Sequence, residues 1–140
     1  MIIYTSPRSG KTTFCNYNPE WIDADVILFS YLNDAFKCDI KDDNRKGDQI
    51  IRLFNINRVR AEKCYTRFME WLKINKYSSN IMLGTRRFMW LADIVFIKDH
   101  EDLNITLKEV ESAKKWNIKY IQLKSDEYIN LKLIFSLINN

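Results

Sequence analysis

The residues best suited to chemistry lie near the start of the chain, in the run Gly10-Lys11-Thr12-Thr13. They follow an apolar, β-prone segment, Ile2-Ile3-Tyr4, and a short polar turn. This order predicts a strand, a tight loop and the first turn of a helix. The first backbone N–H groups of a helix have no partner within it, and together with the helix dipole they attract an anion. The sequence therefore predicts a phosphate-binding loop.

The segment from Thr5 to Thr12 has the length of the G-x-x-x-x-G-K-[ST] motif, with Thr5 in place of the first glycine. In that motif the lysine contacts the β- and γ-phosphates of a nucleotide, and the Ser/Thr hydroxyl ligates Mg²⁺. The alternative is a surface turn in which Gly-Lys-Thr has no function. The residues that we expect to bind the nucleotide are Ser6, Arg8, Ser9, Gly10, Lys11, Thr12 and Thr13.

Two carboxylates, Asp23 and Asp25, stand two positions apart in the short apolar run 21–27. On a strand this spacing puts both side chains on one face, and at the end of a strand both can point into a ligand cleft. Two other interpretations stay open: a turn that merely exposes two acids, or Asp25 as the N-cap of the next helix.

A basic helix face is the third candidate feature. Residues 48–75 have apolar positions at helical spacing, and Asn55-Ile56-Asn57 can divide them into two helices. A solvated helix surface explains the basic residues of the other face, and a lid that presents arginine to phosphates is the functional alternative. These residues are Arg52, Arg58, Arg60, Lys63 and Arg67.

Five short apolar strands, separated by helical segments, position these groups. The strands are expected at residues 2–4, 21–27, 80–83, 94–97 and 118–123, and helices at 11–17, 26–36, 48–75, 106–116 and after Ser125. Thr106 and Glu109 have the spacing of a capping box. Alternating strands and helices predict an α/β fold, a three-layer sandwich with a five-stranded parallel sheet, whose ligand site lies at the carboxyl ends of the strands. The phosphate loop, the Asp23 and Asp25 pair, and Gly84-Thr85-Arg86-Arg87 all fall there.

Composition narrows the classes of protein. The chain of 140 residues is 46% apolar, which predicts one globular domain. A net charge of +4 suits an anionic ligand but makes a dedicated nucleic-acid binder unlikely. No apolar run is long enough to span a bilayer, and three scattered cysteines favour reduced thiols in a cytoplasmic protein. The single histidine, His100, lies in a charged loop, which argues against histidine-based catalysis.

With these elements in this order, the chain resembles the P-loop kinases of nucleotides and other small metabolites, including compact phage-encoded nucleotide kinase-like proteins. Gly10-Lys11-Thr12 matches their phosphate loop, and Ile22-Asp23-Ala24-Asp25 resembles the D-x-D at the second strand of shikimate- and gluconate-kinase-like enzymes. Gly84-Thr85-Arg86 stands where those kinases place acceptor-binding residues, and Tyr120-Ile121-Gln122-Leu123 resembles their final strand. The resemblance implies a P-loop NTPase fold, with residues 1–140 as one kinase-like domain.

The resemblance also implies roles for individual residues, with ATP and Mg²⁺ as cofactors. Thr12 and Asp23 are expected at the metal. Asp25 is expected to bind or deprotonate the acceptor hydroxyl. The expected catalytic residues are Lys11, Asp25, Arg86 and Arg87, the two arginines standing in for lid arginines that residues 98–116 lack. The chain also departs from the family at Thr5 and in having no acidic residue at the end of its third strand.

Three functions are consistent with these features. The first is an ATP-dependent phosphotransferase that acts on a nucleotide or a small hydroxyl-bearing acceptor. The second is a nucleotide-binding switch or assembly protein with weak or no catalysis. The third, indicated by Thr85-Arg86-Arg87 followed by Ala92-Asp93-Ile94-Val95, is a fragment of a packaging-type ATPase.

Overall fold

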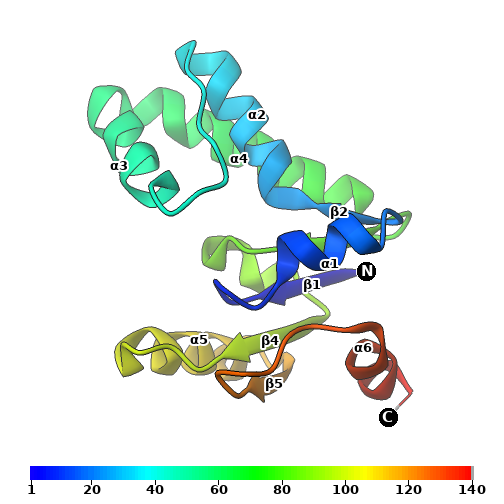
Figure 1. The fold of residues 1–140 in the computed structure, drawn as a ribbon. Helices are drawn as coiled ribbons and strands as arrows, with labels where there is room; N and C mark the ends of the chain where they lie inside the picture. The colour runs from blue at the N-terminus through cyan, green and yellow to red at the C-terminus, as the bar shows by residue number, and fades with distance from the viewer. Residues whose placement is uncertain (140) are drawn as a thin grey trace. The chain divides into compact units, whose positions relative to one another are not determined.

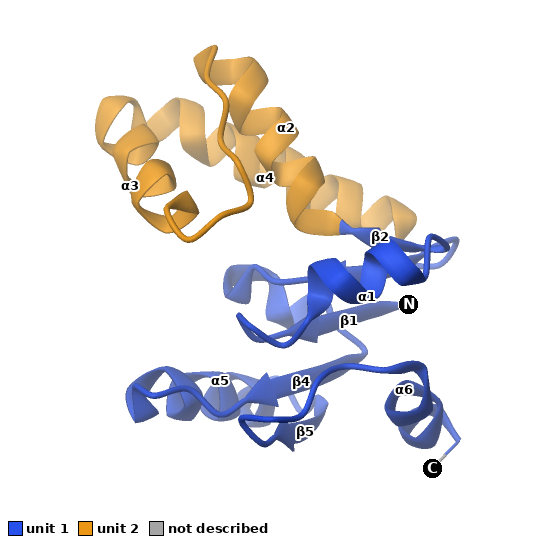
Figure 2. Cartoon of the chain, viewed as in Figure 1, with its two compact units in different colours: residues 1–23, 76–140 blue, residues 24–75 orange. Residues whose placement is uncertain are grey.

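The computed structural model of the chain describes residues 1–139 and divides into two compact units (Figure 2). The first consists of Met1–Asp23 and Lys76–Asn140 and contains the sheet. The second, Ala24–Asn75, contains only helices. The helical unit is thus an insertion in the sequence of the sheet unit. No helix among residues 1–139 combines the length and apolar character that crossing a bilayer requires.

All five strands of the sheet are parallel, in the order β2-β3-β1-β4-β5 (Figure 1). The predicted α/β fold with a five-stranded parallel sheet is therefore confirmed. The strands are β1 (Ile2–Thr5), β2 (Trp21–Asp23), β3 (Asn80–Leu83), β4 (Ile94–Lys98) and β5 (Lys119–Leu123).

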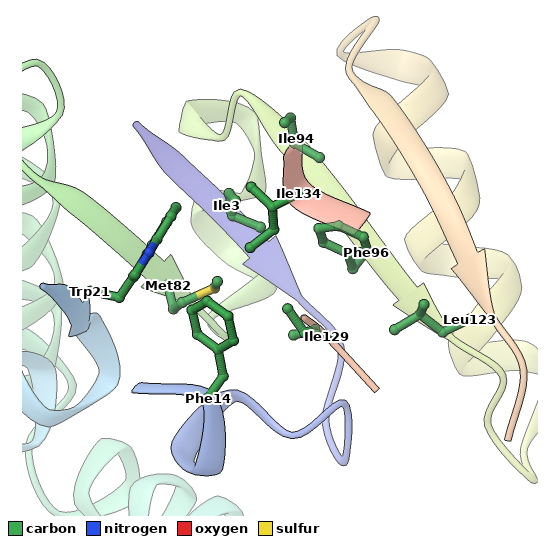
Figure 3. Packing of buried hydrophobic residues seen from close by; sticks show 9 residues of the cluster. All are labelled: Ile3, Phe14, Trp21, Met82, Ile94, Phe96, Leu123, Ile129 and Ile134. Atoms are coloured by element: carbon green, nitrogen blue, oxygen red, sulfur yellow. The ribbon is translucent and has the colours of Figure 1, made fainter. Parts of the chain in front are cut away.

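Helices cover both faces of this sheet. Neighbouring residues of β1 point to opposite faces and therefore contact different helices. Ile3 packs in one cluster with Phe14 of α1 (Lys11–Tyr17) and Ile134 of α6 (Leu131–Ile138), as Figure 3 shows. Tyr4 points the other way and donates a hydrogen bond to Glu109 of α5 (Leu103–Lys115), which packs beside the 3₁₀ helix η1 (Arg86–Leu91). The sheet unit is therefore consistent with three layers.

The connections that leave the strands diverge at β1. The chain leaves β1 toward α1 on one face, whereas it leaves β3 and β4, the two neighbours of β1, toward η1 and α5 on the other face. In parallel sheets, ligands bind where such neighbouring connections diverge, beyond the carboxyl ends of the strands. The loop after β1 is the one segment of this sheet at that position.

The helical unit consists of α2 (Ala24–Phe36), α3 (Lys46–Ile56) and α4 (Arg58–Asn75). The predicted division of the long helical region is confirmed: Asn57 is extended, and its side-chain oxygen accepts a hydrogen bond from Arg60 N at 3.0 Å. Arg60 and Arg67 lie over the rings of Phe36 and Tyr31, with the guanidinium carbons 5.6 and 4.4 Å from the ring centroids. Part of the basic face therefore covers aromatic side chains of its own unit.

Three helix starts differ from the predictions. α2 begins at Ala24, so Asp25 lies in the first turn of a helix rather than on a strand. The capping box at Thr106 was wrong, because Asp102 caps α5 from further upstream by accepting from Asn104 N. The predicted start at Ser125 was also wrong, since α6 begins only after Asn130.

The core predicts a large stability difference between two phenylalanines. Phe96 is fully buried in the cluster of Figure 3, whereas Phe135 of α6 is 54% exposed. Phe96→Ala should lower the free energy of unfolding by about 3–5 kcal/mol, because it leaves a cavity in a packed core. Phe135→Ala should cost less than about 1 kcal/mol. Urea denaturation measures both, and equal losses would contradict this packing.

Candidate functional site

The loop between β1 and α1 curls rather than continuing the strand. Ser6 N donates to Phe96 O at 3.0 Å, which extends the pairing of β1 with β4 by one residue. Beyond it, Arg8 and Gly10 adopt left-handed φ angles of 63° and 90°. Left-handed residues in a turn bring successive N–H groups to one side of the chain, where they form an anion-binding concavity.

Beyond Ser6, three amides of this loop are left for an outside acceptor. Gly10 caps α1 without any side-chain hydrogen bond to the helix. Among residues 1–139, the structure gives the backbone N–H groups of Arg8, Ser9 and Gly10 no acceptor. Unpaired N–H groups are costly when water and ligands are both excluded, so a loop of this kind favours an outside acceptor.

Two serine side chains hold the loop in this shape. Ser9 Oγ donates to Ser6 O at 2.6 Å. Ser6 Oγ donates to Glu109 Oε2 at 2.8 Å and accepts from Lys98 N at 3.0 Å. Ser6 and Ser9 are buried, 3% and 1% exposed. Their hydroxyls therefore brace the loop, and the expected contribution of these two residues to nucleotide binding is limited to the backbone.

Glu109 is a buried carboxylate that links this brace to the sheet. Its Oε2 accepts from Tyr4 at 2.6 Å as well as from Ser6, while its Oε1 is buried without a hydrogen-bond partner. The hydroxyl of Thr5, the residue that replaces the first glycine of the motif, is also buried and without a partner. Unsatisfied polar atoms at the base of the loop cost stability, as is common where a site is kept ready for a ligand.

Lys11 forms an ion pair with Asp23 across the carboxyl edge of the sheet. Lys11 Nζ lies 2.6 Å from Asp23 Oδ1, and each side chain is only 11% exposed. Asp23 is the last residue of β2, so the pair joins the start of α1 to the strand tip. The structure thus brings together two of the predicted site residues. The side chains of Thr12 and Thr13, the next two, are exposed.

A second lysine contacts the loop, and sequence reasoning missed it. Lys98, the last residue of β4, is 7% exposed and donates from Nζ to Arg8 O at 2.9 Å. The same ammonium lies 3.7 Å from the ring centroid of Tyr128. The signal that could have found it is its place at the end of an apolar strand, on the same edge as the loop.

The segment before α6 also touches the loop. Ile129 N donates to Ser9 O at 3.1 Å, and the ring of Tyr128 packs against Gly10. This contact explains why no helix begins at Ser125: the backbone of residue 129 bonds to the loop instead of to its own segment. The loop therefore contacts β4, α5 and the segment before α6.

Two pockets open beside the loop, and Tyr128 lines both. The larger has a volume of about 520 Å³ and is lined by Gly10, Thr13, Phe14, Tyr17, Asn18, Tyr128, Ile129, Asn130 and Leu131. It combines apolar and aromatic walls with two amide side chains. The smaller, of about 250 Å³, is lined by Pro7, Arg8, Lys98, Asp99, His100, Glu101, Ser125 and Tyr128. A chain of phosphates along the loop would pass between them.

The other predicted site residues lie elsewhere. Arg86 lines a pocket against α5, and the guanidinium carbon of Arg87 lies 5.7 Å from the ring centroid of Phe88. Neither pocket beside the loop includes either arginine, as far as residues 1–139 show. Asp25 is buried in the first turn of α2, in the helical unit. Their catalytic roles stay predictions.

The structure favours neither catalysis by Cys38 or Cys64 nor a metal ion held by protein ligands alone. Burial raises the pKa of the Cys64 thiol and the pKa of the Cys38 thiol, which lowers their reactivity near neutral pH. No three His, Cys, Asp or Glu side chains in the described part of the chain are grouped to hold a metal ion.

Gly10 and Gly47 predict opposite effects of alanine. At Gly10, φ is +90° and an added Cβ would lie 3.3 Å from Tyr128 Cδ1, so Gly10→Ala should destabilise the protein by about 1–2 kcal/mol. At Gly47, within α3, an added Cβ meets nothing within 4 Å. Gly47→Ala should stabilise by about 0.5–1 kcal/mol, because alanine favours helix. Thermal unfolding of both variants measures the signs, and a neutral Gly10→Ala would refute the loop conformation.

Compared with models of known protein families and with curated proteins, the sequence matches none.

Proposed function

We propose that the protein is a P-loop NTPase-like phosphotransferase that moves the γ-phosphoryl group of ATP to a nucleotide or a small hydroxyl-bearing acceptor. The observation that carries the proposal is the loop with unpaired amides and Lys11, which follows the central strand where the connections diverge and which borders a pocket of about 520 Å³. Phosphoryl transfer depends mainly on positioning and electrostatics, which these groups can supply.

Phosphate binding falls to the backbone and to Lys11. The N–H groups of Arg8, Ser9 and Gly10 donate to phosphate oxygens. Lys11, held by Asp23 in this structure, exchanges that carboxylate for the β- and γ-phosphates. Because the ion pair is largely shielded from water, this exchange costs part of the binding energy, and the affinity for nucleotide is accordingly moderate.

The donor set fits Mg²⁺. Thr12, an exposed residue, has a hydroxyl and Asp23 a carboxylate, both oxygen ligands of the type that Mg²⁺ prefers. Mg²⁺ is commonly held by one or two protein oxygens together with substrate phosphates, which agrees with the lack of a protein cage among residues 1–139. When bound, the ion neutralises part of the phosphate charge; Thr12 and Asp23 hold it.

The larger pocket suits the nucleoside. Its side chains provide a stacking surface (Phe14, Tyr17, Tyr128) and hydrogen-bonding amides (Asn18, Asn130) beside the phosphate loop. Apolar walls with a few directed polar groups are typical of small-molecule sites. Asp25 as the acceptor-binding residue, and Arg86 and Arg87 as charge-stabilising residues, complete the proposal.

A nucleotide-binding switch with little catalysis is the second candidate, and one observation favours it. Arg86 and Arg87 face α5 and Phe88 rather than the two pockets beside the loop. A kinase without an arginine near the transferred phosphate loses several orders of magnitude in rate. Arg8 and Lys98, which line the smaller pocket, are the cations that can take the place of Arg86 and Arg87.

Nucleotide binding is the first test. ATP with Mg²⁺ at about 100 times its Kd should stabilise the protein by about 2.7 kcal/mol and raise its melting temperature. Lys11→Ala should abolish this shift, whereas Lys132→Ala, an exposed lysine of α6, should keep it. Differential scanning fluorimetry measures all three. If ATP still raised the melting temperature of Lys11→Ala, the loop would not be the nucleotide site.

Release of ADP then separates a kinase from a switch. A coupled assay over nucleosides, nucleoside monophosphates and small hydroxyl compounds should find an acceptor that raises ADP release above hydrolysis in water. Arg86→Ala and Arg87→Ala should each lower that rate at least tenfold if they stabilise charge in the transition state. Binding without acceptor-dependent release would favour the switch, and hydrolysis stimulated only by DNA would favour the packaging-type ATPase.

Tyr17 tests the nucleoside pocket. It is 83% exposed, so its truncation should leave the fold intact. Tyr17→Ala should weaken ATP about tenfold by removing a stacking surface, but should leave inorganic tripolyphosphate unaffected. Tyr77→Ala, at a tyrosine that is 91% exposed and outside this pocket, is the control. Isothermal titration calorimetry gives the affinities, and equal losses for both ligands would place the base elsewhere.

A further inference from the structure

One surface of the sheet unit combines two tryptophans with basic side chains, away from the residues that line the pockets beside the loop. Trp90, in η1, and Trp116, directly after α5, are 38% and 48% exposed. Their ring centroids lie 6.4 Å apart, with the planes inclined by 44°. Two neighbouring indoles beside cationic side chains form a mixed aromatic and basic surface. The proposed phosphotransferase uses neither ring.

A basic pocket adjoins these rings. It has a volume of about 300 Å³ and is lined by Arg86, Lys108, Glu111, Ser112 and Lys115. The helical spacing of residues 108, 111, 112 and 115 puts all four on one face of α5. Three cations against one carboxylate give this pocket a positive charge.

Lys115 connects the pocket to the rings. Its ammonium lies 5.1 Å from the ring centroid of Trp116 and also lines the pocket. Cationic groups and an indole face are therefore neighbours on one continuous surface, which we name the tryptophan–lysine surface. It comprises Arg86, Trp90, Lys108, Lys115 and Trp116.

We propose that the tryptophan–lysine surface binds single-stranded nucleic acid. The lysines and Arg86 contact backbone phosphates, and an unpaired base stacks on Trp116. Proteins that bind single strands combine a positive groove with aromatic stacking platforms in this way. A duplex offers phosphates but hides the faces of its bases, and an acidic peptide would use the lysines without the indoles. Both are therefore poorer partners for this surface.

The mild net charge of +4 for the whole chain is compatible with a local surface of this kind. Binding by about three cations is weak and strongly salt-dependent, not the tight association of a strongly basic protein. For single strands, the logarithm of the binding constant falls with the logarithm of the salt concentration, with a slope near −0.7 per neutralised phosphate. For about three phosphates, raising the salt from about 50 to about 200 mM should therefore weaken binding about 20-fold.

Fluorescence anisotropy of labelled oligodeoxythymidine and oligouridine tests the proposal with the full chain at low salt. Both strands should bind, with the predicted salt dependence, and a duplex of the same length should bind more weakly. DNA and RNA arms distinguish which polymer is preferred, and a preference for either supports the proposal. Failure of both strands to bind, or tighter binding of the duplex, would overturn it.

Matched variants locate the binding. Trp116→Ala should weaken single-strand binding at least about fivefold, and Trp116→Phe should retain most of it, because phenylalanine keeps a stacking face. Tyr77→Ala, at an exposed tyrosine elsewhere, should change nothing. Lys115→Glu should weaken binding and flatten the salt dependence, whereas Lys132→Glu, with the same charge change on α6, should not.

Equal losses in Lys115→Glu and Lys132→Glu would show diffuse electrostatic binding and overturn the assigned surface. Binding of polyglutamate with the same dependence on Trp116 would assign the surface to acidic peptides instead and would also overturn the proposal. Thermal shift by ATP should persist in Trp116→Ala and Lys115→Glu. The two proposals share Arg86, whereas Lys115 and Trp116 belong to this surface alone. Loss of single-strand binding in these two variants, with the shift by ATP unchanged, therefore separates the two sites.

Discussion

The parallel pairing of β1 between β3 and β4 is the constraint on which the proposed site depends. It places the end of β1 in the centre of the carboxyl edge. Lys98 ends the neighbouring strand β4, and Asp23 ends β2, on the other side of β3. Because the chain leaves β1 and its neighbours toward opposite faces, helices do not cover this position. The loop after β1 therefore lies open where charged strand ends converge.

Within that loop, side chains and backbone have separate tasks. The hydroxyls of Ser6 and Ser9 and the ammonium of Lys98 bond to the loop or to its supports, so they fix its shape. The amides of Arg8, Ser9 and Gly10 stay without acceptors among residues 1–139. A loop whose shape is already held by hydrogen bonds needs little reorganisation when an anion binds, and preorganisation of this kind is what makes electrostatic sites effective.

Tyr128 couples the loop to the end of the chain. Its ring touches Gly10 and Lys98 and lines both pockets, while its neighbour Ile129 bonds to Ser9. Residues 128–130 therefore connect the loop to the first turn of α6, where Asn130 accepts from Leu133 N. Thr5 Oγ1 and Glu109 Oε1, beneath the loop, are buried without a hydrogen-bond partner.

The sequence by itself determined the parallel α/β fold, the division of the helical insertion at Asn57, and the loop around Gly10 and Lys11. These are local signals: apolar strands, helical periodicity, and a turn whose residues fix their own backbone angles.

Only the tertiary structure decided how the surrounding residues are used. Lys98 begins the charged segment 98–102, whose composition is typical of a solvated loop, yet Lys98 is buried and its ammonium lies over the ring of Tyr128, which is distant in sequence. Ser125 is a plausible helix cap, but the hydrogen bond from Ile129 to Ser9 removes the backbone that such a helix would need. Arg86 lines a pocket on α5 rather than one beside the loop, since the direction of a side chain after a strand depends on what packs against it. Contacts between distant segments set burial and direction, and no local pattern encodes them.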